Sequence, residues 1–66
     1  MKANKLKGKL VEKGMNVETL AKLIGVDKST LYRKLNDFDT FTLGDVTKIA
    51  KVMGLSNKEA YELFIA

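Results

Sequence analysis

Two short helical patterns meet at Gly25, and this junction constrains the fold more than any other stretch of the chain. Asn16 and Asp27 each precede one of the patterns, and both are residue types that cap a helix N-terminus by accepting a backbone N–H. Gly25 can adopt the left-handed conformation that ends a helix, so the chain turns within about three residues. Residues 16–36 are therefore predicted to form a helix-turn-helix.

The apolar residues of this stretch fall on one face of each predicted helix. Leu31 and Leu35, four residues apart, mark the inward face of the second helix. Ala21 is small where the second helix has to approach the first closely. The inward face of the first helix is predicted to carry Val17, Leu20, Leu23 and Ile24.

The opposite face of the second helix is polar. Donors and acceptors recur there at spacings of three and four residues. Such a row can contact base edges when a helix enters the major groove of DNA. An ordinary solvated helix face is the alternative interpretation. The row consists of Lys28, Ser29, Tyr32, Arg33 and Asn36.

Length and composition limit the class of protein. The 66 residues are expected to make a single domain, residues 1–66, with a modest core. The chain has no cysteine, which excludes disulfides and a zinc site and fits a reducing cytoplasm. No apolar run reaches the ~20 residues that cross a membrane, and MKANKLKGKL lacks the hydrophobic segment of a signal peptide. Proline is absent and the apolar spacing is helical throughout, so an all-α domain is predicted.

A first helix is predicted over residues 3–13. Asn4 is its expected cap and Gly14 its expected end. Leu6 and Leu10 are expected to face inward, joined by Val11.

Two more helices are predicted over residues 43–53 and 57–65. Each opens with a capping box, from Thr42 to Asp45 and from Ser56 to Glu59. Their predicted inward residues are Leu43, Val46, Ile49, Ala50 and Met53 in the fourth helix, and Ala60, Leu63 and Phe64 in the fifth.

The loop over residues 36–41 is both acidic and aromatic. Phe38 is expected to pack on the core or on a partner, because so large an apolar side chain is poorly solvated. Asp37 and Asp39 would repel a DNA strand if the loop lay against one.

Positive charge is concentrated in the first half of the chain. Residues 1–34 hold nine Lys/Arg and three Asp/Glu, a net charge of +6, whereas residues 35–66 carry −2. A one-sided positive potential attracts polyanions such as the DNA backbone. Lysine-rich surfaces also occur merely for solubility, so the charge alone does not decide the partner.

The segments LAKLIGVDKSTLYRKL and FTLGDVTKIAKVMGLS resemble the Cro- and lambda-repressor-like helix-turn-helix family of phage and bacterial regulators. Ala21, Gly25 and Leu31 stand at the family's spacing, and the likeness covers nearly the whole chain. The resemblance implies a compact five-helix domain that binds operator DNA, usually as a symmetric dimer. The chain ends after the fifth predicted helix, which resembles a minimal phage-type regulator without a separate oligomerisation domain.

The resemblance also implies site residues. The family's base-contacting positions fall on Lys28, Ser29 and Arg33, and Tyr32 is exposed where it can reach a base or a phosphate. The family's phosphate contact before the first helix of the pair falls on Asn16 or Val17, of which Val17 has only its backbone N–H to offer. The full set of expected phosphate contacts is Asn16, Val17, Thr19, Lys22, Lys34 and Asn36.

Three functions remain in competition at this point. The expected one is a DNA-binding transcriptional regulator that works without a cofactor and pairs through Tyr61, Phe64 and Ile65. Closing the core is the alternative role of these residues, and it is the favoured one for Phe64. The second is a protein-interaction module, such as an antirepressor that docks on another regulator. Catalysis is disfavoured because the chain has no histidine or cysteine and no glycine-rich phosphate loop or metal-ligand spacing.

Overall fold

The computed structural model describes residues 2–65, which form five α-helices and one short 3-10 helix and contain no strand. The predicted all-α class is therefore confirmed. No helix within this range has the length and apolar character needed to span a membrane. The elements are α1 (Lys2–Glu12), α2 (Val17–Ile24), α3 (Lys28–Asn36), η1 (Phe38–Thr40), α4 (Leu43–Met53) and α5 (Asn57–Phe64).

Local chemistry sets most of the helix ends as predicted. The side chain of Asn16 accepts the backbone N–H of Thr19 at 2.8 Å and caps α2. Gly25 ends α2 at φ 78°, a left-handed conformation that a residue with a Cβ adopts only with strain. Both capping boxes are complete: the cap side chain and the third residue of the helix exchange hydrogen bonds at the starts of α4 and α5.

One predicted cap is wrong, and a second lacks the hydrogen bond expected of it. α1 begins at Lys2, so Asn4 lies inside it, because buried Ala3 extends the apolar row of Leu6 and Leu10 by one turn. Asp27 occupies the N-cap position of α3 in an extended conformation, but its side chain makes no capping hydrogen bond.

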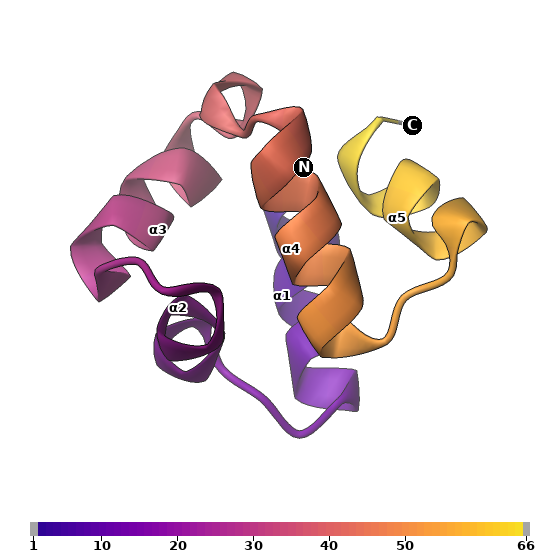
Figure 1. Ribbon diagram of the computed structural model, residues 1–66, viewed down its shortest axis with the longest axis horizontal. Helices are drawn as coiled ribbons and strands as arrows, with labels where there is room; N and C mark the ends of the chain where they lie inside the picture. The colour runs from indigo at the N-terminus through magenta and orange to yellow at the C-terminus, as the bar shows by residue number, and fades with distance from the viewer. Residues whose placement is uncertain (1, 66) are drawn as a thin grey trace.

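The helices pack around α4. Figure 1 shows α4 in the middle with α1 behind it, α2 and α3 on one side and α5 on the other. α2 contacts both α3 and α4, while α5 contacts α1 and α4. The five largest fully buried side chains come from four of these helices and form the centre of the core: Leu6, Leu10, Leu20, Leu31 and Ile49.

Three residues predicted to face inward are exposed instead. They are Val11 in α1, Leu23 in α2 and Leu43, which is 83% exposed at the start of α4. Each lies at the edge of its helix's apolar stripe. The neighbouring helices cover a narrower strip than the sequence pattern marks, so the edge positions remain in solvent.

Three phenylalanines close the end of the core between η1 and α5. The ring centroid of Phe38 lies 4.8 Å from that of Phe41 and 5.4 Å from that of Phe64. Phe38 therefore packs on the core, one of the two positions expected for it. Phe64 is buried within its own chain, so it is unavailable as the exposed dimer contact that the sequence suggested.

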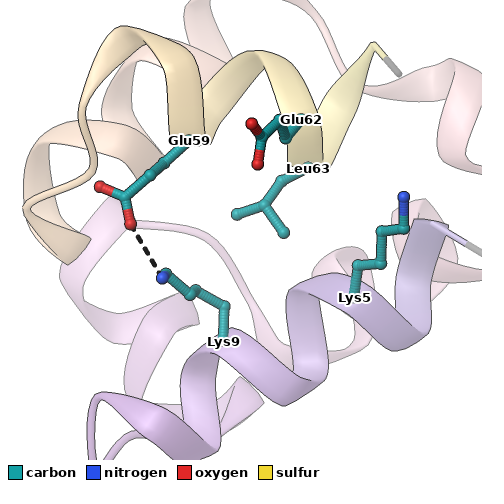
Figure 2. Close-up of a pocket in the computed structure, with 5 residues that line it drawn as sticks. All are labelled: Lys5, Lys9, Glu59, Glu62 and Leu63. Atoms are coloured by element: carbon teal, nitrogen blue, oxygen red, sulfur yellow. Dashed lines mark ion pairs between the residues drawn. The ribbon is translucent and has the colours of Figure 1, made fainter.

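Charged groups join the first helix to the last. Lys9 Nζ of α1 lies 2.8 Å from Glu59 Oε2 of α5 and 3.4 Å from Glu12 Oε1. Figure 2 shows Leu63 reaching from α5 toward α1 between Lys5 and Lys9, with the Lys9–Glu59 ion pair at one edge. Apolar burial and a short ion pair thus hold α5 against α1 together.

Candidate nucleic-acid interface

α3 is held from one side only, which leaves its opposite side to solvent. Buried Leu31 and Leu35 face α2 and the core. Successive α-helical residues are about 100° apart, so the position opposite this apolar seam is that of Arg33, with Ser29 and Asn36 beside it. All three are exposed. Three of the five residues of the predicted polar row therefore point outward, on a helix whose inner side is packed against the core.

Lys28 and Tyr32 occupy the flank of α3 that lies nearest α2. Lys28 Nζ is 3.6 Å from Glu18 Oε2 in the first turn of α2. Tyr32 is 44% exposed and lines a hollow with Lys7 and Asn16, so its ring lies beside the N-terminus of α2.

Arg33 lies near the acidic segment that follows α3. Its Nη2 donates a hydrogen bond to Thr30 Oγ1 at 3.3 Å, one turn earlier in the helix. Arg33 and Asp37 line the same shallow hollow, and Asp37 and Asp39 are both exposed. Negative charge therefore adjoins the C-terminal end of the row, whereas its start is cationic.

The N-terminus of α2 supplies backbone donors. Val17 is buried, so only its backbone N–H can meet a phosphate oxygen. First-turn N–H groups have no acceptor within their own helix and suit an anion. The side chains of Asn16 and Thr19 are exposed but bonded to each other, because Thr19 Oγ1 donates to Asn16 Oδ1 at 3.0 Å.

The two lysines expected to contact phosphate differ sharply. The side chain of Lys22 is 78% exposed, and its Nζ is a loose 3.9 Å from Glu18 Oε1. Lys34 Nζ lies 2.6 Å from Asp45 Oδ2, and both side chains are only 23% exposed. The charge of Lys34 is therefore paired with a carboxylate of α4, whereas that of Lys22 is open to solvent.

Glu18 and Asp45 are the residues of this surface that sequence reasoning missed. Glu18 stands four residues before Lys22, a spacing that indicates an ion pair on one helix. Its second partner, Lys28, belongs to the next helix and has no such signal. Asp45 was recognised only as part of a capping box.

No three histidine, cysteine or acidic side chains gather as a potential metal site between residues 2 and 65. The arrangement instead presents cations, hydroxyls, amides and helix N–H groups on one side of a helix pair. These are the groups that contact phosphates and base edges of duplex DNA.

A comparison with protein families matches residues 5–64 to the model of the Cro/C1-type HTH DNA-binding domain. The chain belongs to this family. No significant match was found among curated proteins or solved structures. In this Cro/C1-type domain, α2 and α3 form the helix-turn-helix, and α3 stands where the recognition helix of such a motif is expected.

Proposed function

We propose that this Cro/C1-type domain, as a single folded unit, is a phage-type repressor that binds operator DNA in the cytoplasm and performs no chemistry. The observation that carries the proposal is the exposed row of Ser29, Arg33 and Asn36 on α3, opposite the buried seam of Leu31 and Leu35. A helix held in this way can enter the major groove without exposing its apolar side.

The base contacts are assigned to α3. Arg33 has the planar donor pair that matches guanine O6 and N7, and Lys28 can bind the same acceptors with less directionality. Ser29 can donate to or accept from several bases. Tyr32 is assigned to the edge of the groove, because it lies beside Asn16 at the start of α2.

The phosphate contacts are assigned to α2 and to the ends of α3. Of the two lysines expected to contact the DNA backbone, Lys22 is the more exposed. The N–H of Val17, the amide of Asn16 and the hydroxyl of Thr19 surround the start of α2, and Asn36 ends α3. Such contacts orient the protein on the duplex and make its binding dependent on salt.

We also propose that two copies pair through α5. Tyr61 and Ile65 are 57% and 61% exposed, and with Leu43 they border an apolar groove between η1, α4 and α5. Pairing about a two-fold axis would cover these side chains, whereas Phe64 would support the interface from within the core.

Selection of bound sequences from a random DNA pool, at low and at high salt, tests the proposal. The expected result is enrichment of a palindrome whose half-sites lie about one helical turn, ~34 Å, apart. Enrichment of a sequence without two-fold symmetry would contradict the dimer but not operator recognition. Retention of DNA at low salt without any enrichment would contradict operator recognition and favour a module that docks on another protein.

A further inference from the structure

Lys34 is bound unlike the other cations of α3. Its ammonium group lies 2.6 Å from Asp45 Oδ2 and 3.4 Å from the carbonyl oxygen of Thr40. The same nitrogen is 5.9 Å from the centroid of the Phe41 ring, within cation–π range. Lys34 is thus joined to η1, to the segment after it and to α4. Freeing it for a phosphate would leave the largely covered carboxylate of Asp45 without its partner.

Asp45 is itself held in place by the start of α4. Its Oδ2 accepts the backbone N–H of Thr42 at 3.0 Å, and its own N–H donates to Thr42 Oγ1 at 3.1 Å. One carboxylate oxygen therefore accepts hydrogen bonds both from the N-cap residue of α4, Thr42, and from Lys34 in the last turn of α3. This oxygen is a fixed point on a helix at the centre of the fold (Figure 1).

The apolar seam alone leaves one motion of α3 poorly restrained. Leu31 and Leu35 lie nearly in line along the helix, so they resist its displacement more than its rotation about its own axis. Lys34 lies about 100° from Leu35 around the helix, on the side away from Lys28. A bond at that position opposes rotation. On the other flank, the Lys28–Glu18 pair is longer, at 3.6 Å, and both of its side chains are 56% exposed.

We propose that Lys34, held by Asp45, is a positioning residue that sets the rotation of α3 and does not bind phosphate. The inference rests on the proposed function and adds a determinant of sequence discrimination to it. Base contacts require side chains held to within roughly 10–20° of the productive direction, whereas long flexible lysines still reach phosphates after a small rotation. Loss of the Lys34–Asp45 bond should therefore impair discrimination before it impairs general DNA affinity.

The test compares Lys34→Met with Lys22→Met in the full chain. The affinity of each variant is measured over a salt series, for the selected sequence and for random duplex. Lys22→Met should weaken binding to both duplexes alike and reduce the slope of log affinity against log salt by about one. Lys34→Met should keep the wild-type slope and its affinity for random duplex, but lose roughly tenfold in discrimination.

Asp45→Asn separates positioning from charge. The substitution makes the chain more positive, so electrostatics alone predicts tighter binding to every duplex. Positioning predicts the same loss of discrimination as in Lys34→Met. The single variant Lys34→Arg, which keeps a cation beside Asp45, should retain the discrimination of the wild type. All measurements are made at a temperature at which circular dichroism finds each variant fully folded, which removes a merely structural effect.

Two outcomes would overturn the inference. In one, Lys34→Met behaves like Lys22→Met, with a reduced slope and equal loss on both duplexes, which would make Lys34 a phosphate ligand. In the other, Asp45→Asn binds every duplex more tightly and keeps full discrimination. A wild-type chain that does not distinguish the two duplexes at all would instead contradict the proposed function itself.

Discussion

At the scale of single residues, the surface proposed to face DNA is not uniformly positive. Glu18 Oε2 lies 3.6 Å from Lys28 Nζ, and Glu18 Oε1 lies 3.9 Å from Lys22 Nζ. Both ion pairs are exposed, so each is worth roughly 0.2–1 kcal/mol and weakens in salt. Glu18 therefore reduces the attraction that these lysines exert on phosphate without holding them firmly.

Replacing Glu18 by Gln should strengthen binding to any duplex at low salt. The expected gain is about two- to fivefold, the equivalent of one exposed ion pair, and it should disappear as the salt concentration rises. Affinity for random duplex at two salt concentrations measures it. Glu62→Gln makes the same change in net charge on α5, which lies on the opposite side of α4 from α3 in Figure 1. An equal gain in that control would show that net charge, and not the position of Glu18, is responsible.

Arg33 should contribute to discrimination more than to general affinity. Its exposed guanidinium lies opposite the buried seam of α3, with one nitrogen bonded to Thr30 Oγ1 at 3.3 Å. Arg33→Ala should weaken binding to the preferred sequence by ~1–3 kcal/mol and barely change binding to random duplex. Competition titrations with the two duplexes compare these losses directly. If both losses were equal, Arg33 would act only as a charge.

At the scale of elements, the Lys9–Glu59 pair joins the two ends of the fold. The carboxylate of Glu59 bonds to Lys9 and accepts the backbone N–H of Ser56 at 3.0 Å. Its hydrogen bond with Lys9, followed by that from Ser56, lowers the pKa of Glu59 from 4.5 to about 2. The same two kinds of partner, Lys34 and the N–H of Thr42, lower the pKa of Asp45.

The lowered pKa of Glu59 predicts an acid-dependent loss of stability. A carboxylate whose pKa is lower in the folded than in the unfolded chain stabilises the fold at pH values above its unfolded pKa. This stabilisation is lost as the pH falls from 4.5 to about 2. Glu59→Gln should therefore melt at a lower temperature than the wild type at neutral pH. The melting temperatures of the two proteins should converge as the pH falls to about 2.

Thermal melts over a pH series measure this convergence, and Glu62→Gln is the matched control. Glu62 lies in the same helix and makes no ion pair within the described range of the chain. A constant difference between Glu59→Gln and wild type at every pH would mean that Glu59 acts through packing alone.

At the scale of the whole molecule, size favours two copies on one operator. The Cα trace measures 27 × 24 × 21 Å, and its longest dimension is less than the ~34 Å between half-sites one helical turn apart. A backbone of this size matches one half-site, which agrees with the proposed pairing of two copies. The groove bordered by Leu43, Tyr61 and Ile65 is the exposed apolar surface that a second copy would cover.

Ile65→Asp should shift the chain from dimer to monomer. A buried, unpaired carboxylate in an apolar interface is strongly unfavourable, whereas the same group on a free surface is tolerated. Sedimentation equilibrium measures the change, and Leu23→Asp places the same charge on an exposed leucine of α2. A wild-type chain that stays monomeric with and without its operator would contradict the dimer.

The sequence by itself determined the features that depend on neighbours three or four residues away. Thr42 with Asp45, Ser56 with Glu59 and Asn16 with Thr19 are such pairs, and the bonds predicted for the two boxes are present. Gly25 turns the chain for an equally local reason, its lack of a Cβ. The starts of α2, α4 and α5 and the turn at Gly25 follow from these interactions, and the outward row on α3 follows from helical periodicity.

Only the tertiary structure decided the features that depend on which helix lies alongside. Val11, Leu23 and Leu43 belong to apolar stripes by sequence, yet no neighbouring helix covers them. The charge of Lys34 was assigned to DNA, but the fold places it beside Asp45. The physical reason is that helical periodicity gives the direction of each side chain around its own axis. What that side chain meets depends on the packing of helices far apart in the sequence.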